Sequence, residues 1–275
     1  MQTATIHGIE MGYRAEGDGA PLLLVHGFPL SGAMWQPQIS ALSARYRVIA
    51  PDLRGFGAST FGGGADSLDQ YADDLLALLD HLDVRKVALA GLSMGGYIAF
   101  ALLRRAADRV SALVLADTKA AADSDEARQK REQNARMVET RGLEPLADQM
   151  LPNLLADRTP QGQQQVVRGI IMANQPEGIA AALRAMAQRP DSTPQLSAIN
   201  VPTLIMVGSE DTLTPPGEAR KLHEAIKGSQ FVELSGAAHL SNIEAPAAFN
   251  AAVDSFLGGN STRAYGAGSQ SSGRW

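Results

Sequence analysis

The stretch "AGLSMGGYIAF", residues 90–100, joins an apolar segment to a segment with helical spacing. The residues just before it carry no charge, which is typical of a strand buried on both faces. From Met94 onward, apolar side chains recur at the spacing of a helix. Ser93 is therefore expected at a sharp strand-to-helix turn. Its flanking residues Gly91 and Gly95 complete the G-x-S-x-G pattern of a nucleophile elbow.

Strand-like and helix-like segments alternate on both sides of this turn. An opening hairpin is expected over residues 3–17, because polar and apolar residues alternate there. The predicted strands that follow are 21–27, 46–52, 86–90, 109–117, 201–211 and 230–236, and the predicted helices between them are 31–44, 67–83, 216–227 and 242–257. This alternation predicts an α/β fold, with a mostly parallel sheet and helices on both faces.

One long segment interrupts the alternation. Residues 119–190 show the spacing of helices and no strand pattern. The sequence therefore predicts a helical cap inserted into a core formed by 1–118 and 191–258. The insertion follows a strand, and it should therefore emerge at the carboxyl edge of the sheet, where open sheets bind ligands. Residues 259–275 are rich in Gly and Ser and are expected to form a flexible tail.

Composition excludes several classes of function. The formal net charge of −5 argues against a nucleic-acid partner, because binding phosphates requires clustered Lys and Arg. The chain has no cysteine, which excludes disulfides and thiol catalysis. It has neither a metal-ligand cluster nor a phosphate-binding loop, so we expect no metal and no cofactor. With no signal peptide and no apolar run near the roughly 20 residues of a membrane span, we expect a cytoplasmic protein without a membrane partner.

A serine nucleophile requires a base and an acid that orients the base. Among five histidines, His239 follows the last predicted strand and should lie at the same edge of the sheet as Ser93. Asp211 follows the strand before it and is the favoured acid, while Asp117 is an alternative at the end of an earlier strand. The chain order Ser93, Asp211, His239 is nucleophile, acid, base.

The backbone can stabilise the oxyanion that forms when an acyl group is attacked. The expected donors are the amides of Met94, which follows the nucleophile, and of Phe28, in the loop after the first parallel strand. His26, in the same loop, is expected to be structural. The candidate substrate-binding side chains are Phe28, Met94, Trp35, Met137 and Met172, with Phe61 as a weaker candidate.

Five ordered motifs resemble the α/β-hydrolase family over about residues 5–257: "HGFP", "PDLRGFGAST", "GLSMGG", "GSEDTLTPP" and "AAHLSNIEAP". Within that family the chain is most similar to bacterial carboxylesterases and to 3-oxoadipate enol-lactonases. The resemblance implies a serine hydrolase with a helical cap and no cofactor, in which Asp52 and Arg54 are structural. Ser93 replaces the aspartate nucleophile of haloalkane dehalogenases and epoxide hydrolases, which speaks against those activities.

We therefore predict a hydrolase, a monomer or homodimer, that cleaves carboxylic esters of small or medium apolar groups. An enol-lactonase or a C–C bond hydrolase would use the same triad and differ in the cap. A perhydrolase side activity and a small-molecule receptor on the same fold are further alternatives.

Overall fold

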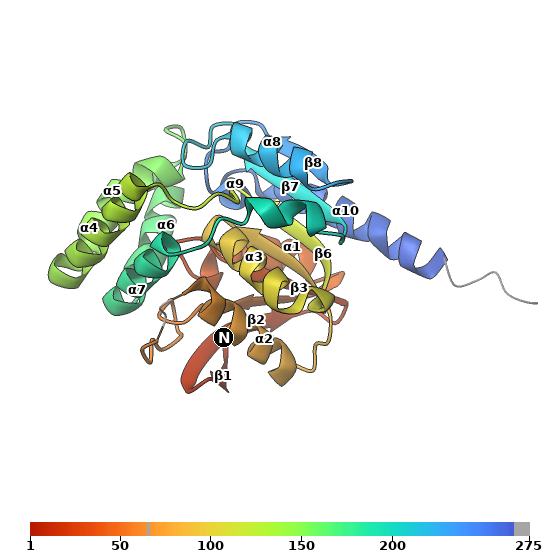
Figure 1. Ribbon diagram of the computed structural model, residues 1–275, viewed down its shortest axis with the longest axis horizontal. Helices are drawn as coiled ribbons and strands as arrows, with labels where there is room; N and C mark the ends of the chain where they lie inside the picture. Colours follow the sequence, from red (N-terminus) through yellow and green to blue (C-terminus); the bar gives the residue numbers. More distant parts are fainter. Residues whose placement is uncertain (65–66, 267–275) are drawn as a thin grey trace, which may run out of the picture.

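Eight strands form one sheet in the computed structural model, which describes residues 1–64 and 67–266, with side chains to 259 (Figure 1). The sheet order is β1-β2-β4-β3-β5-β6-β7-β8. The strands are β1 (Gln2–Ile6), β2 (Ile9–Glu16), β3 (Ala20–Val25), β4 (Tyr46–Pro51), β5 (Val87–Leu92), β6 (Val110–Ala116), β7 (Thr203–Gly208) and β8 (Gln230–Leu234). β1 and β2 pair antiparallel, and β2 pairs antiparallel with β4, while the strands from β4 to β8 are parallel. The predicted fold class is confirmed.

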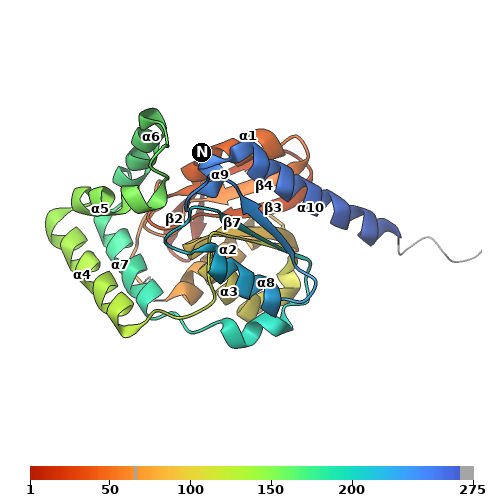
Figure 2. The same ribbon diagram turned by 90° about the horizontal axis from the view of Figure 1, so that it is seen from above.

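Helices cover both faces of the sheet (Figure 2). One face carries α1 (Gln36–Leu42) and α10 (Pro246–Gly266), and the other carries α2 (Leu68–His81), α3 (Met94–Ala106) and α8 (Pro216–Ala225). Successive strand residues point to opposite faces. Leu23 and Val25 of β3 therefore belong to the apolar cluster under α2 and α3, while Leu22 and Leu24 belong to the cluster under α1 and α10. Burial on both faces explains the uninterrupted apolar runs in the sequence.

Two helices differ from the sequence predictions. Residues 31–44 form a short 3-10 turn, η1 (Gly32–Trp35), followed by α1. The last helix is divided into α9 (Ser241–Glu244) and α10, which starts at Pro246 because proline suits the first position of a helix. The predicted tail starts at residue 259, but α10 continues to Gly266, and the rest of that prediction lies outside the described residues.

Four helices occupy the insert, residues 119–190, and this fully described range contains no strand. They are α4 (Asp125–Arg141), α5 (Glu144–Leu154), α6 (Gln161–Met172) and α7 (Pro176–Ala187), with α4 packed along α7. Both apolar clusters of the sheet continue into them: Val138 and Ile179 join the cluster under α2 and α3, and Leu154 and Val167 join the other. The insert therefore shares its apolar interior with the core.

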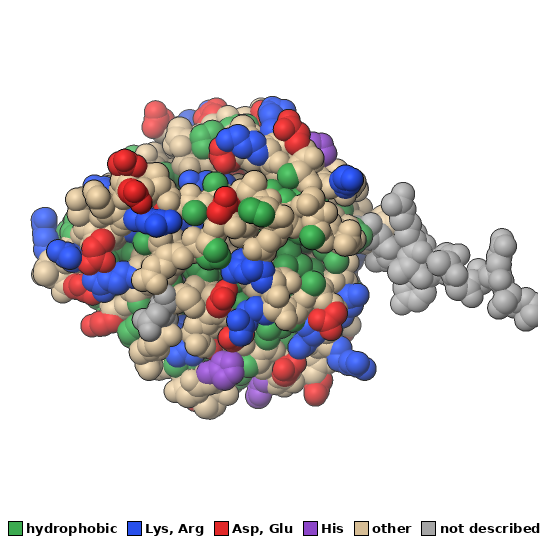
Figure 3. Space-filling model, in the orientation of Figure 1, with side chains coloured by type: hydrophobic (Ala, Val, Ile, Leu, Met, Phe, Trp, Pro, Cys, Tyr) green, Lys and Arg blue, Asp and Glu red, His purple; other side chains and the backbone are tan. Residues whose placement is uncertain are grey.

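The distribution of surface charge and the length of the apolar helices concern two kinds of partner, nucleic acids and membranes. Basic and acidic side chains are interspersed on the face drawn in Figure 3. Ion pairs join many of the charged side chains of the described residues, such as Arg104 with Asp69 and Arg220 with Glu233. No helix within the described residues is both long enough and apolar enough to span a bilayer.

Candidate active site

The carboxyl ends of five neighbouring parallel strands carry five of the residues singled out in the sequence. Ser93 follows β5, the strand between β3 and β6. Asp117 follows β6, Asp211 lies in the loop after β7, and His239 lies in the loop after β8. Phe28 follows β3. All five residues therefore meet at the edge of the sheet where open α/β sheets bind ligands.

Ser93 occupies a strained turn. Its backbone angles are φ 55° and ψ −113°, a region that residues other than glycine rarely adopt. The turn is tight: a Cβ on Gly91 would lie 2.3 Å from the Gly95 carbonyl oxygen, and one on Gly95 would lie 2.1 Å from the Val25 carbonyl oxygen. The Thr118 hydroxyl donates to the Ser93 carbonyl at 2.8 Å. The G-x-S-x-G spacing is thus required by close approach of the backbone.

Ser93, His239 and Asp211 form one chain of hydrogen bonds. His239 Nε2 lies 2.8 Å from Ser93 Oγ, and His239 Nδ1 lies 2.9 Å from Asp211 Oδ2. An ionised carboxylate only accepts, so Nδ1 carries the proton and Nε2 is free to accept from the serine hydroxyl. Asp211 also accepts from the amides of Leu213 and Thr214, both at 2.9 Å, and these bonds hold its carboxylate in place.

The hydrogen bond between His239 and Asp211 changes the pKa of both groups. Burial alone would raise the pKa of Asp211, but the His239 ring and the Thr214 donors hold it below its ordinary value. Burial alone would lower the pKa of His239, but the hydrogen bond and the negative charge of Asp211 raise it above 6.5. Asp211 is therefore ionised near neutral pH, and it stabilises the protonated form of His239.

Asp117, the rival acid, occupies a different place. Its carboxyl group accepts from the Gly208 amide at 2.8 Å and contacts the Ser241 hydroxyl, with no hydrogen bond to His239 among the described residues. Burial raises the pKa of Asp117 to about 8. At neutral pH this carboxyl group is therefore mostly protonated, and its bonds join the end of β7 to the segment that follows His239.

The two backbone amides predicted to stabilise an oxyanion, those of Met94 and Phe28, belong to segments that adjoin Ser93. Met94 is the first residue of α3, so its amide belongs to the helix terminus, where N–H groups lack partners within the helix. The Gly27–Phe28 loop lies against the elbow, because a Cβ on Gly27 would be 3.4 Å from Ser93 Cβ. His26 anchors this loop by accepting the Leu53 amide at 3.0 Å, and burial lowers its pKa to about 4.

The loop that contains Asp52 and Arg54 is held by hydrogen bonds within the loop and to neighbouring segments. Asp52 accepts from the amides of Gly32 and Ala58, both at 2.8 Å. Arg54 donates twice to the buried Asp74, at 2.8 Å each. Both residues support the loop beside the site, as the family resemblance implies.

A cavity of about 140 Å³ adjoins Ser93 and His239. Its other lining residues come from both the core and the insert: Phe28, Tyr97, Lys119, Arg131, Met150, Met186, Leu213 and Thr214. An outer cavity of about 260 Å³ shares Phe28, Arg131, Met150 and Leu213 with it. Residues of the helical insert therefore form part of the wall around the serine.

Most of the predicted substrate-binding side chains do not line this cavity, and those predictions were wrong. Trp35 is fully buried against Phe249 on the far face of the sheet. Met137 packs on the apolar cluster under α2 and α3, as does Phe61, and Met172 is exposed at the end of α6. The Met94 side chain is fully buried in the core, and its amide is the group near Ser93. Phe28 is the predicted residue that does line the cavity.

The lining residues that the sequence did not single out as site residues are Tyr97, Lys119, Arg131, Met150, Met186, Leu213 and Thr214. Two sequence signals pointed to some of them. Leu213 lies two residues after Asp211, and Tyr97 lies one helical turn after Ser93. The methionines carry no such signal, because which face of an insert helix turns toward the site depends on how the insert packs.

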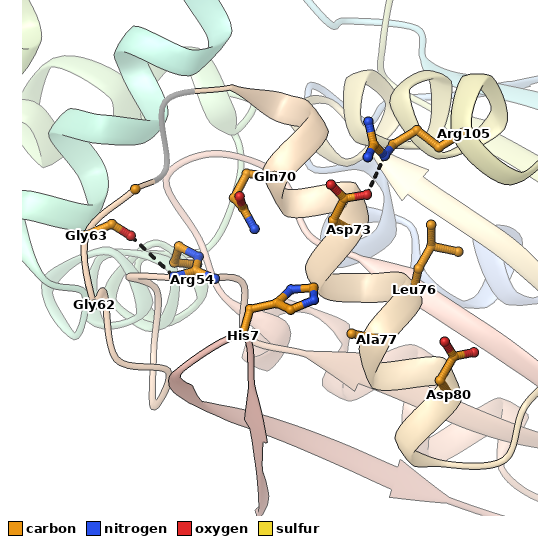
Figure 4. Close-up of a pocket in the computed structure, with 11 residues that line it drawn as sticks. His7, Arg54, Gly62, Gly63, Gln70, Asp73, Leu76, Ala77, Asp80 and Arg105 are labelled. Atoms are coloured by element: carbon orange, nitrogen blue, oxygen red, sulfur yellow. Dashed lines mark hydrogen bonds and ion pairs between the residues drawn. The ribbon is translucent and has the colours of Figure 1, made fainter.

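A larger cavity of about 680 Å³ lies away from the serine (Figure 4). It is bordered by His7, the glycine-rich loop 62–64 and α2, and no residue of the hydrogen-bonded chain lines it. Its charged groups have partners: Arg105 binds Asp73, Asp80 binds Arg109, and His7 lies 2.9 Å from the buried Asp74. In the part of the chain that the structure describes, no group of three or more metal-ligating side chains occurs.

Comparisons with known proteins agree with this geometry. The chain is 31% identical over 260 residues to 3-oxoadipate enol-lactonase 2 of Acinetobacter baylyi, covering 93% of this chain and 96% of that protein. A thermophilic esterase from Thermogutta terrifontis, solved with malate bound, superimposes with a TM-score of 0.92 at 41% identity, covering 94% of this chain and 99% of that one. The enol-lactonase of Burkholderia xenovorans LB400 superimposes with a TM-score of 0.86 at 34% identity, covering 93% and 99%.

The family model of the alpha/beta hydrolase fold matches residues 20–246. That range runs from β3 to the start of α10 and includes all three residues of the hydrogen-bonded chain. Esterases and enol-lactonases are among the related proteins of nearly the same length, and this chain is a hydrolase. It belongs to the α/β-hydrolase family.

Proposed function

We propose that this protein is a serine hydrolase that cleaves carboxylic esters and lactones through Ser93, His239 and Asp211. The observation that carries the proposal is the unbroken chain of hydrogen bonds, 2.8 Å from Ser93 to His239 and 2.9 Å from His239 to Asp211. A hydroxyl becomes a nucleophile when an oriented base can accept its proton, and this arrangement meets that requirement.

The reaction follows from the roles of these groups. His239 Nε2 takes the proton as Ser93 Oγ attacks the carbonyl carbon, and the amides of Phe28 and Met94 stabilise the oxyanion. His239 then gives the proton to the leaving alcohol, leaving an acyl group on Ser93. Water, activated by His239 in the same way, hydrolyses the acyl-enzyme. Asp211 keeps the His239 proton on Nδ1 throughout and stabilises the imidazolium.

The helical insert acts in this proposal as a cap. Arg131, Met150 and Met186 of the insert line the cavity at Ser93 and reduce its contact with water. A drier site strengthens the attraction between the oxyanion and the amide dipoles, because the local dielectric is lower. A cavity of about 140 Å³ favours a small acyl group.

Lactone hydrolysis is the second activity within this proposal. It is favoured by the similarity to two enol-lactonases of Acinetobacter baylyi, at 31% and 34% identity. A lactone is an internal ester, so it requires the same nucleophile and oxyanion donors. A C–C bond hydrolase, a perhydrolase side activity and a receptor remain alternatives with no specific observation in their favour.

The purified protein is expected to hydrolyse p-nitrophenyl esters and to prefer short acyl chains over long ones. Each additional methylene gains about 0.8 kcal/mol when buried, but that gain ends when the cavity is full. The measurement is kcat/KM for a series of acyl lengths, with γ- and δ-lactones assayed beside them. Replacing Met186 with alanine should move the optimum to longer chains. Failure to hydrolyse any ester or lactone would contradict the proposed function.

The rate of hydrolysis is expected to depend on pH through His239. Protonated His239 cannot accept the serine proton, so kcat/KM should fall as pH is lowered through the pKa of His239. Asp211 raises that pKa, which places the midpoint of the acid limb above 6.5. In Asp211→Asn the midpoint should move to lower pH, because burial lowers the pKa of His239 and the negative charge that opposes this effect is removed. The exposed His81, changed to Gln, is the control, and a midpoint at or below 6.5 in the parent protein would contradict this assignment.

A further inference from the structure

Lys119 lines the cavity that contains Ser93, and its side chain is half-buried. It lies three residues after the end of β6 at Ala116, on the segment that leads into the insert. Its ammonium group makes no hydrogen bond or ion pair with any residue that the structure describes. An exposed lysine without a partner is ordinary because water solvates its charge. A half-buried lysine loses part of that solvation, and here no ion pair compensates for the loss.

The charges around Lys119 leave this cavity positive. Arg131 lines both the inner and the outer cavity. The carboxylate nearest to Arg131 is Asp123, one oxygen of which binds Arg131 while the other lies 2.8 Å from Arg189. Glu218 is the other acid that acts on Lys119, and it is bound by Lys221 at 2.6 Å. Both nearby acids are therefore paired with other cations.

The surroundings also affect the protonation of Lys119. Burial lowers its pKa, and the charges of Arg189 and Arg131 lower it further, against the attraction of Asp123 and Glu218. An anion bound by Lys119 and Arg131 would oppose both the loss of solvation and the repulsion between cations that lower the pKa of Lys119. Charge-assisted hydrogen bonds from Lys and Arg to a carboxylate are short and strong, so these two side chains are suited to bind one.

We propose that Lys119, together with Arg131, binds a carboxylate carried by the substrate, so that the preferred substrates are half-esters of dicarboxylic acids. The inference rests on the proposed function, because it concerns the same cavity. It departs from the apolar ester expected from the sequence alone. Lys119 is the residue to test, because removing Arg131 would also leave the buried Asp123 with one partner fewer.

The test compares two ethyl esters of the same shape. Monoethyl glutarate carries a carboxylate, and the ethyl ester of glutaramic acid carries a neutral amide in its place. The parent protein should hydrolyse the anionic ester with a kcat/KM at least about tenfold higher, the range expected for a charged hydrogen bond. Lys119→Met should remove that preference by lowering kcat/KM for the anionic ester at least about tenfold more than for the neutral ester. Lys119→Arg should keep part of that preference.

The matched control is Lys227→Met. It removes the same charge at the opposite end of the sheet, where Lys227 borders a separate cavity with Thr203 and Gln230 at the amino ends of β7 and β8. This variant should keep the preference of the parent protein. Equal rates for the two esters in the parent, or a loss in Lys119→Met that is the same for both esters, would overturn the inference.

A binding measurement separates this inference from the proposed hydrolysis. Monoethyl glutarate should bind to Ser93→Ala in calorimetry and should bind at least about tenfold more weakly to Ser93→Ala/Lys119→Met. Binding that depends on Lys119, without hydrolysis by the parent protein, would support the carboxylate site and contradict the esterase function. Hydrolysis of the neutral ester without Lys119-dependent binding would support the function and overturn the carboxylate site.

Discussion

Replacing Ser93 with alanine is expected to lower kcat for ester hydrolysis by about 10⁶-fold, the loss found when the nucleophile of a serine protease triad is removed. The hydroxyl that His239 contacts at 2.8 Å is absent in this variant, so no acyl-enzyme can form. The fold should remain, because backbone hydrogen bonds hold the elbow and alanine can form them. One of them joins the Ser93 N–H to the Ala116 carbonyl at 2.9 Å.

The measurement is steady-state hydrolysis of a p-nitrophenyl ester, with thermal unfolding to verify the fold. The control is Ser111→Ala, which removes an exposed hydroxyl from β6 and should leave kcat unchanged. An organophosphonate should label Ser93 in the parent protein, as mapped by mass spectrometry. If Ser93→Ala keeps more than about one per cent of the parent activity, or if another residue is labelled, the assignment of the nucleophile is wrong.

Replacing Asp211 with asparagine is expected to lower kcat by about 10⁴-fold, the loss measured when the triad aspartate of a serine protease is made neutral. The amide cannot supply the negative charge that stabilises protonated His239. It can also donate to Nδ1, which favours the wrong tautomer and leaves Nε2 protonated. The amides of Leu213 and Thr214 would still hold the side chain in position, so the loss should be in kcat more than in KM.

Asp117→Asn is the matched comparison for Asp211→Asn. With its pKa raised to about 8, Asp117 is mostly a neutral acid at neutral pH, and an amide of the same shape can keep the bond from the Gly208 amide. Activity should fall by less than about tenfold, because no bond to His239 is lost. A severe loss in Asp117→Asn with little effect in Asp211→Asn would make Asp117 the acid.

Much of the fold and the hydrogen-bonded chain could be predicted from the sequence because their signals are local. The elbow is indicated by Gly91 and Gly95, which flank Ser93 and have no room for a side chain. The buried strands are indicated by uninterrupted apolar runs. Once the strands are parallel, their carboxyl ends share one edge, so Asp211 and His239 have to lie near Ser93. Both Asp211 and Asp117 fit the chain order, so the preference for Asp211 rested on its place in the loop after the penultimate strand. The contact that decides between them, 2.9 Å from His239 to Asp211, is a tertiary one.

The walls of the cavity depended on tertiary structure. Both Met172 and Met186 lie on helices of the insert, yet one is exposed and the other borders the cavity at Ser93. Trp35 looked suited to a binding site but is buried against Phe249, a partner distant in the sequence. Lys119 has no ion pair because its acidic neighbours Asp123 and Glu218 bind other cations. Periodicity determines which face of a helix is apolar, but the packing of distant segments decides what that face covers and which charges remain without a partner.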